Sequence, residues 1–253
     1  MCFTTVRTLS DSFRAERSPI TLVIFDLDDT LYDEGDFVRG GFRAVGLELE
    51  RRGVGPHAEV AALLEQFHFA ESRAGVFQKL AARRAFPEEW IPDLVDCYRS
   101  HAPSIQLAAD AREVLPTLVS RYRIGCVTDG WAAVQRRKIA ALGVESYLHA
   151  LSLTDELGVE YWKPHARAFD EVREKLAADR AATVVVGDNP ERDMAGARNA
   201  GLRSIRLRRP GGYFSSREYT QPEMRSDFEI SDLRSLPDIL HQLSAPVAGR
   251  LDV

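Results

Sequence analysis

Short apolar segments alternate with longer amphipathic ones along most of the chain after residue 20. Each apolar segment is rich in β-branched residues and ends in polar ones: TLVIFD (21–26), YRIGCVTD (122–129), ALSL (150–153), TVVVGD (183–188) and SIRL (204–207). The intervening spacing predicts helices over about 111–120, 132–142, 166–178 and 191–200. FEISDLRSLPDILHQL (228–243) adds a short strand and a closing helix. This alternation predicts an α/β fold, a Rossmann-like parallel sheet with helices on both faces.

One long stretch, from about residue 33 to 109, contains no strand-like segment. Val60, Leu63, Leu64 and Phe67 have helical spacing, and residues 88–100 repeat the pattern. Because so long a connection is unusual for a loop in a compact domain, it predicts an inserted helical domain. We therefore predict a polar N-terminal arm (1–19), a discontinuous α/β core (20–33 and 108–253) and a helical domain (34–107).

Composition and charge narrow the class of protein. The chain has 253 residues, of which 45% are hydrophobic and 28% charged, and its formal charge is −5. The chain has no long basic block, so a nucleic-acid polymer is not expected as a partner. It also has no apolar run long enough to span a membrane. Three widely spaced cysteines, Cys2, Cys97 and Cys126, indicate neither a disulfide framework nor a zinc site. We expect a cytoplasmic protein with a small-molecule partner, either a monomer or a homodimer.

The acidic stretch VIFDLDDTLYDEGD (23–36) is the strongest chemical signal. Asp26 ends the first predicted strand, and Asp28 follows two residues later. A calcium-binding EF-hand loop does not fit, because Leu31 stands where that loop needs glycine and Phe37 where it needs glutamate. Turn or helix capping explains one aspartate but not two at the tip of a buried strand.

Other predicted strand tips supply groups that complement these carboxylates. They are Thr128 and Asp129 after the second strand, Lys163 in EYWKPHARAF (160–169), and Asp188 and Asp193 in GDNPERD (187–193). The carboxyl ends of parallel strands meet at one edge of a sheet, so these groups are expected to converge. Carboxylate oxygens of Asp26 and Asp188 suit Mg²⁺. Lys163 and Thr128 then remain to bind the oxygens of a phosphoryl group.

Four motifs in this order resemble the haloacid dehalogenase (HAD) superfamily of hydrolases. They are DLDDT (26–30), Thr128, Lys163 and GDNPERD (187–193), and the resemblance covers about residues 21–207. It implies a HAD-like core, with the inserted helical domain as a cap at the C1 position. VTDG and KPHARAF are most similar to the nucleotidase and acylneuraminate-phosphatase branch.

The resemblance also implies roles. Asp26 is expected to be the nucleophile that forms an aspartyl-phosphate, and Asp28 the general acid and then the general base. The implied sets are catalytic Asp26, Asp28, Thr128 and Lys163; phosphate-binding Thr128, Asp129 and Lys163; and Mg²⁺-binding Asp26, Asp28, Asp188 and Asp193.

Asp28 separates two branches of this family, because its dehalogenases carry a non-acidic residue at that place. We therefore predict a Mg²⁺-dependent phosphomonoesterase of a small metabolite, either a sugar phosphate or a nucleoside monophosphate. One departure is TDG (128–130), where the family commonly has Thr-Asn-Gly. Asp129 adds a negative charge beside the phosphate site, which would weaken substrate binding or change local hydrogen bonding.

Two alternatives stay open from the sequence. A phosphoglucomutase-like phosphotransferase shares the counterparts of Asp26 and Asp28. A phospho-accepting signalling module also uses aspartate, threonine and lysine at strand tips, but it lacks a large inserted domain.

Overall fold

The computed structural model describes residues 18–244, so most of the predicted arm at 1–19 lies outside the described residues. The described chain divides into two compact units. The first comprises 18–33, 107–135 and 143–244, and the second comprises 34–106 together with 136–142. The first unit contains the sheet, and the second is helical.

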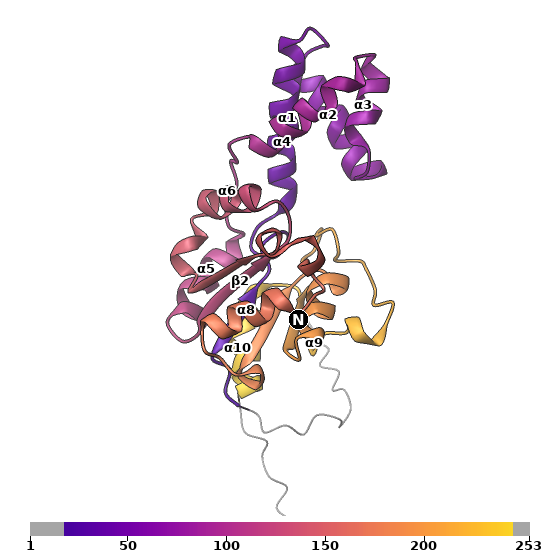
Figure 1. Ribbon diagram of the computed structural model, residues 1–253. Coiled ribbons are helices and arrows are strands. Elements are labelled where there is room, and N and C mark those ends of the chain that lie inside the picture. Colours follow the sequence, from indigo (N-terminus) through magenta and orange to yellow (C-terminus); the bar gives the residue numbers. More distant parts are fainter. Residues whose placement is uncertain (1–17, 245–253) are drawn as a thin grey trace, which may run out of the picture. The chain divides into compact units, whose positions relative to one another are not determined.

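A six-stranded parallel sheet forms the centre of the first unit (Figure 1). Its spatial order is β3 (Ala150–Leu153), β2 (Arg123–Thr128), β1 (Leu22–Phe25), β4 (Thr183–Gly187), β5 (Arg203–Leu207) and β6 (Phe228–Ile230). Phe25 aligns with Cys126 on one side and with Val186 on the other. The carboxyl ends of β1, β2 and β4 therefore lie together at one edge, and the predicted fold class is confirmed.

Helices of the first unit cover the apolar strands. They are α5 (Ala109–Val119), α6 (Ala132–Leu142, whose second half groups with the other unit), α7 (Thr154–Leu157), α8 (Arg167–Lys175), α9 (Ala195–Asn199) and α10 (Leu236–Ser244). Phe169 and Val172 of α8 pack on Ile24 and Val185 of the sheet. Gly125 permits this close packing, because a Cβ atom there would lie 2.4 Å from Val172.

The predicted helix over 191–200 is interrupted. A wide π-helical turn, η6 (Pro190–Met194), precedes α9. The side-chain oxygen of Asn189 accepts hydrogen bonds from the main-chain N–H groups of Glu191 and Arg192 at 3.0 and 3.2 Å, which fixes the start of this turn. The polar GDNPERD segment is thus held at the tip of β4.

The second unit contains α1 (Glu34–Arg51), α2 (His57–Glu65), the π-helical turn η1 (Gln66–Glu71), α3 (Val76–Arg84), the 3-10 turn η2 (Glu88–Trp90), α4 (Ile91–Ser100) and the second half of α6. Their apolar faces bury Phe42, Leu64, Leu80 and Leu94 in a common core. An inserted helical domain is therefore present, as the sequence predicts.

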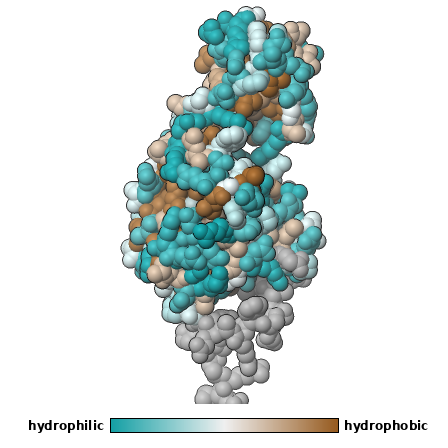
Figure 2. Space-filling view, viewed as in Figure 1, coloured by the Kyte–Doolittle hydropathy of each residue, from teal (hydrophilic) through white to brown (hydrophobic). Residues whose placement is uncertain are grey.

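The visible surface of the described chain is mainly polar, with scattered apolar residues (Figure 2). Within residues 18–244, no helix is both long enough and apolar enough to cross a bilayer.

Candidate active site

Loops at the carboxyl edge of the sheet bring the sequence-predicted residues into one buried group. Asp26 follows β1, Thr128 ends β2, and Asp188 follows β4. Lys163 belongs to the loop before α8, and Asp193 to η6. All five residues are buried, each with no more than 7% of its surface exposed. Their contacts come from segments far apart in sequence, so the group exists only when the sheet is assembled.

Lys163 connects two carboxylates of this group. Its ammonium donates to Oδ1 of Asp26 at 2.5 Å and to Oδ1 of Asp193 at 2.7 Å. Burial opposes the charged form of Lys163, but the two carboxylates outweigh this and raise its pKa well above the ordinary value. Lys163 is therefore a permanent positive charge at the tip of β1.

Three carboxylates offer a site for a divalent cation. Asp26, Asp188 and Asp193 each place one oxygen within 4.8 Å of the others. Burial raises the pKa of Asp26 to about 8 despite the ammonium of Lys163, and burial also raises that of Asp188 well above its ordinary range. Among the described residues, Oδ2 of Asp188 is buried without a hydrogen-bond partner.

These observations fit a metal ion. When all three aspartates are ionised, Lys163 balances one negative charge and leaves two, which is the charge that a divalent cation neutralises. The donors are all carboxylate oxygens, which are the ligands that Mg²⁺ prefers. The orphaned oxygen of Asp188 also needs a partner, since an unpaired buried polar atom is costly.

Asp28 lies outside this carboxylate group. Its side chain accepts hydrogen bonds from the hydroxyl group of Tyr32 and, at 2.9 Å, from the amide of Gln135. The same amide of Gln135 also donates to the hydroxyl oxygen of Thr128. The structure therefore does not bring Asp28 into the predicted metal set, but it holds this carboxylate in one orientation beside Thr128.

Neither Tyr32 nor Gln135 was expected at the site from the sequence. The only sequence signal for Tyr32 is its position four residues after Asp28 in the same loop. In the structure its side chain is completely buried. Gln135 is one turn into α6 and has no signal in the sequence beyond its place in the helix that follows TDG.

Asp129 is bound by three donors. Its Oδ1 accepts from the Thr154 hydroxyl at 2.8 Å and from the main-chain N–H of Lys163 at 3.1 Å. Its Oδ2 accepts from the Arg192 guanidinium at 2.6 Å. The additional charge that the sequence places here is therefore paired with Arg192. Neither Thr154 nor Arg192 was expected at the site.

Two further contacts shape the loops that carry Asp26 and Asp188. The Thr30 hydroxyl donates to Oδ2 of Asp26 at 3.1 Å, and Asp29 between them has a φ of 54°, a left-handed conformation that aspartate tolerates well. Arg206 is fully buried within β5 and donates through Nε to the carbonyl oxygen of Asp188 at 3.3 Å. A buried arginine in a strand is not expected from the apolar pattern of SIRL.

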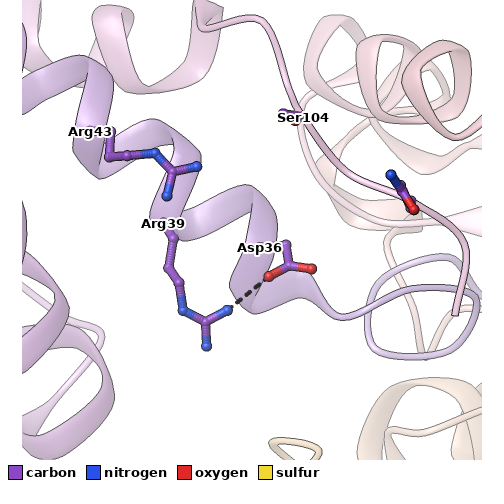
Figure 3. Close-up of a pocket in the computed structure, with 5 residues that line it drawn as sticks. Asp36, Arg39, Arg43 and Ser104 are labelled. Carbon is purple, nitrogen blue, oxygen red and sulfur yellow. Dashed lines mark hydrogen bonds and ion pairs between the residues drawn. The ribbon is translucent and has the colours of Figure 1, made fainter.

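The helical unit has a surface pocket of its own, with a volume of about 280 Å³. Arg39 and Arg43 extend into it from successive turns of α1 (Figure 3), and Ser104 and Gln106 complete the lining. Arg39 pairs with Asp36 at 3.0 Å. The lining of the pocket is polar, with one carboxylate, Asp36, and no carboxylate cluster comparable to the group at the sheet edge.

The family model of the "haloacid dehalogenase-like hydrolase" matches residues 23–207, which span the whole buried group at the sheet edge. The chain belongs to this family. The family predicted from the four motifs is therefore confirmed, and the protein is a hydrolase of the HAD type.

Two curated relatives match nearly the whole chain. A glyceraldehyde 3-phosphate phosphatase from Methanopyrus kandleri is 30% identical over 238 residues, covering 89% of this chain and 99% of the relative. The pyrimidine 5′-nucleotidase YjjG of Escherichia coli is 25% identical over 228 residues, covering 86% of this chain and 96% of the relative.

Among solved structures, the HAD hydrolase YfnB from Bacillus subtilis, crystallised with bound magnesium, superposes with a TM-score of 0.64 at 20% identity. The superposition covers 88% of this chain and 99% of that protein. This likeness confirms the HAD-like fold of the chain.

Proposed function

We propose that this hydrolase is a phosphomonoesterase that removes the phosphoryl group of a small metabolite through an aspartyl-phosphate on Asp26. The observation that carries the proposal is the placement of Asp28. It lies two residues after Asp26 and is oriented by hydrogen bonds from Tyr32 and Gln135. A carboxyl group held in this way can give a proton to an oxygen leaving group.

In the first step, a carboxylate oxygen of Asp26 attacks phosphorus, and the bond from phosphorus to the ester oxygen breaks. Asp28 donates its proton to that oxygen, which leaves as an alcohol. In the second step, Asp28 accepts a proton from water while the water oxygen attacks the phosphoryl group. Inorganic phosphate is released, and the carboxylates of Asp26 and the acid form of Asp28 are restored.

Lys163 and Thr128 would stabilise the phosphoryl oxygens during both steps. Lys163 is a buried, permanently charged donor, and Thr128 offers a hydroxyl group at the tip of the adjacent strand. Fixed donors in a buried site stabilise developing charge far better than water does. Lys163 also limits the repulsion between the anionic Asp26 and its anionic substrate.

Asp26, Asp188 and Asp193 would hold the Mg²⁺ ion, which supplies screening of the negative charge between nucleophile and phosphate. The orphaned Oδ2 of Asp188 supports this assignment. The hydrogen bonds of the Asp28 side chain to Tyr32 and Gln135 support a role in proton transfer in place of the metal ligation that the family resemblance implies for it.

A sugar phosphate or a nucleoside monophosphate is the proposed substrate class. The two curated relatives act, by their names, on a phosphorylated triose and on pyrimidine nucleotides. Both are small phosphate monoesters, which supports a small metabolite and not a phosphorylated polymer.

The test is phosphate release from p-nitrophenyl phosphate and from a panel of sugar phosphates and nucleotides, with Mg²⁺ and with EDTA. We expect turnover with Mg²⁺ alone and none in Asp26→Asn. Asp238→Asn, an exposed carboxylate on α10, is the matched control and should retain turnover. Absence of metal-dependent turnover on the whole panel would overturn the proposal. Isomerisation without phosphate release would instead favour a phosphotransferase, and a stable phosphoprotein would favour a signalling module.

A further inference from the structure

Asp129 is the centre of a small network that joins three loops of the first unit. It follows β2, its partner Arg192 lies in η6 after β4, and the Lys163 N–H lies in the loop before α8. The Asp129 side chain is 13% exposed and that of Arg192 is 46% exposed. The two oxygens of Asp129 have different donors: Oδ1 accepts from Thr154 and Lys163, and Oδ2 accepts from Arg192.

Oδ1 of Asp129 positions the segment that carries Lys163. It accepts from the main-chain N–H of Lys163 itself and from the hydroxyl of Thr154. The ammonium of Lys163 must reach both Asp26 and Asp193, so anchoring its main chain restricts where that ammonium can lie. An asparagine oxygen could accept the same two hydrogen bonds, so these contacts do not require a charge.

Oδ2 is different, because its partner is a cation. The amide nitrogen of asparagine could not accept from Arg192, so this contact does require the carboxylate. Arg192 directly precedes Asp193, so the ion pair also connects the Lys163 loop to the segment that bears a proposed metal ligand. Without Arg192, the largely buried carboxylate of Asp129 would lose this ion pair next to Thr128, where an anionic phosphoryl group has to bind.

We propose that Asp129 is a positioning residue for Lys163, and that Arg192 neutralises its charge so that a carboxylate is tolerated beside the phosphate-binding group. The inference rests on the proposed phosphatase function and deepens it. It replaces direct phosphate binding by the Asp129 side chain with an indirect role, and it names Arg192 as a determinant of affinity for the anionic substrate.

The test compares Arg192→Gln, Asp129→Asn and the double variant with the wild-type enzyme. Arg192→Gln removes the cation that pairs with Asp129 and should raise KM about tenfold, while kcat changes less than about twofold. The reason is that phosphate binding is weakened equally in the ground state and in the transition state. Adding Asp129→Asn removes that charge and keeps the Oδ1 acceptor, so the double variant should return KM to within about threefold of wild type.

Asp129→Ala tests the positioning role separately. It removes the anchor of the Lys163 main chain and should lower kcat about 10- to 100-fold, as expected for a small misplacement of a catalytic group. Arg198→Gln, an exposed arginine on α9, makes the same charge change as Arg192→Gln and serves as control. Thermal unfolding of each variant shows whether the fold is intact.

Binding of inorganic phosphate to the same proteins, measured by calorimetry with Mg²⁺, provides a readout independent of turnover. We expect the wild type and the double variant to bind inorganic phosphate more tightly than Arg192→Gln does. If the double variant binds no better than Arg192→Gln, or if Arg192→Gln matches wild type, the charge-neutralising role is wrong. A wild-type protein that binds phosphate but turns over no ester would overturn the proposed function alone, and the affinity order would still test the pair.

Discussion

The ammonium of Lys163 lies 2.5 Å from a carboxylate oxygen of Asp26, although 137 positions separate the two residues. Both side chains are almost completely buried, with 3% and 9% of their surfaces exposed. Buried charges of this kind are tolerated only when they are paired. Removing either one therefore affects both the stability of the fold and the chemistry of the site.

Lys163→Met should lower kcat/KM at least about 10²-fold, because it removes a fixed donor to the phosphoryl oxygens. Above about pH 8, where Asp26 is ionised, the metal-free protein should also lose about 3–5 kcal/mol of unfolding free energy, since Asp26 and Asp193 are left without their cation. Steady-state kinetics and urea unfolding measure the two effects. Lys175→Met is a suitable control, because the side chain of Lys175 is 53% exposed and pairs with Glu171 at the surface. Wild-type kcat/KM in Lys163→Met would contradict the role given to this residue.

Asp28→Asn should reduce kcat about 10²- to 10⁴-fold with little change in thermal stability, because the amide can no longer transfer a proton. With p-nitrophenyl phosphate, the rate of phosphoenzyme formation should fall less than the rate of its hydrolysis, because the nitrophenolate leaving group needs little protonation. The covalent phosphoryl adduct on Asp26 should therefore accumulate, and intact-protein mass spectrometry of quenched samples would detect it. An adduct in neither this variant nor the wild type, with turnover intact, would argue for direct attack by water.

Burial of Asp26 has a consequence for the pH dependence of stability in the absence of metal. Its pKa is raised from 3.8 to about 8, so the folded protein holds a proton that the unfolded chain releases. The unfolding free energy in EDTA should thus fall as the pH rises from about 4 to about 8. Asp26→Asn removes the titrating group and should flatten this slope. A slope that Asp26→Asn leaves unchanged would exclude Asp26 as its source.

Mg²⁺ should reverse this trend. Binding requires the ionised carboxylates, so the stabilisation by a fixed excess of Mg²⁺ should grow with pH over the same range. At a concentration of 100 times the dissociation constant, the gain is about 2.7 kcal/mol. Thermal unfolding with and without Mg²⁺ at several pH values measures it, and Asp188→Asn should abolish most of the gain.

The convergence of Asp26, Thr128, Lys163, Asp188 and Asp193 was predictable from the sequence. Asp26, Thr128 and Asp188 end or directly follow apolar strand segments, and the geometry of a parallel sheet places such strand ends along one edge. Asp193 lies shortly after β4, and Lys163 lies in the connection between β3 and β4. The approximate positions of the strands and helices were also predictable, because the period of the hydrophobic residues differs between strands and helices.

Contacts made by side chains across loops were not predictable in this way. Arg192, whose guanidinium reaches Asp129, lies in the wide turn η6, and periodicity does not distinguish such a turn from an ordinary helix. Likewise, the orientation of Asp28 toward Tyr32 and Gln135 depends on rotamers and on the left-handed residue Asp29. The placement of Asp28 outside the group formed by Asp26, Asp188 and Asp193 follows from these local details.

A second ion pair, between Asp110 and Arg209, contacts the loop that follows β1. Asp110, at the start of α5, is 2% exposed and accepts from Arg209 at 2.7 Å and from the main-chain N–H groups of Leu233 and Ala111 at 2.9 and 2.8 Å. Arg209 also donates to the carbonyl oxygen of Thr30 at 3.0 Å. Burial works against the ionised form of Asp110, but these hydrogen bonds, led by that from Arg209, outweigh it and lower its pKa.

Asp110→Ala should therefore lower the unfolding free energy by about 3–5 kcal/mol at neutral pH, because Arg209 and two main-chain donors lose their partner. Because the pKa of Asp110 is lowered in the fold, this contribution is present above pH 3.8 and is lost as the pH falls through the folded pKa. The difference between wild type and Asp110→Ala in urea unfolding should accordingly shrink toward low pH. Asp238→Ala, which removes an exposed carboxylate, should cost less than about 0.5 kcal/mol. Equal losses in the two variants would show that the buried network around Asp110 does not stabilise the fold.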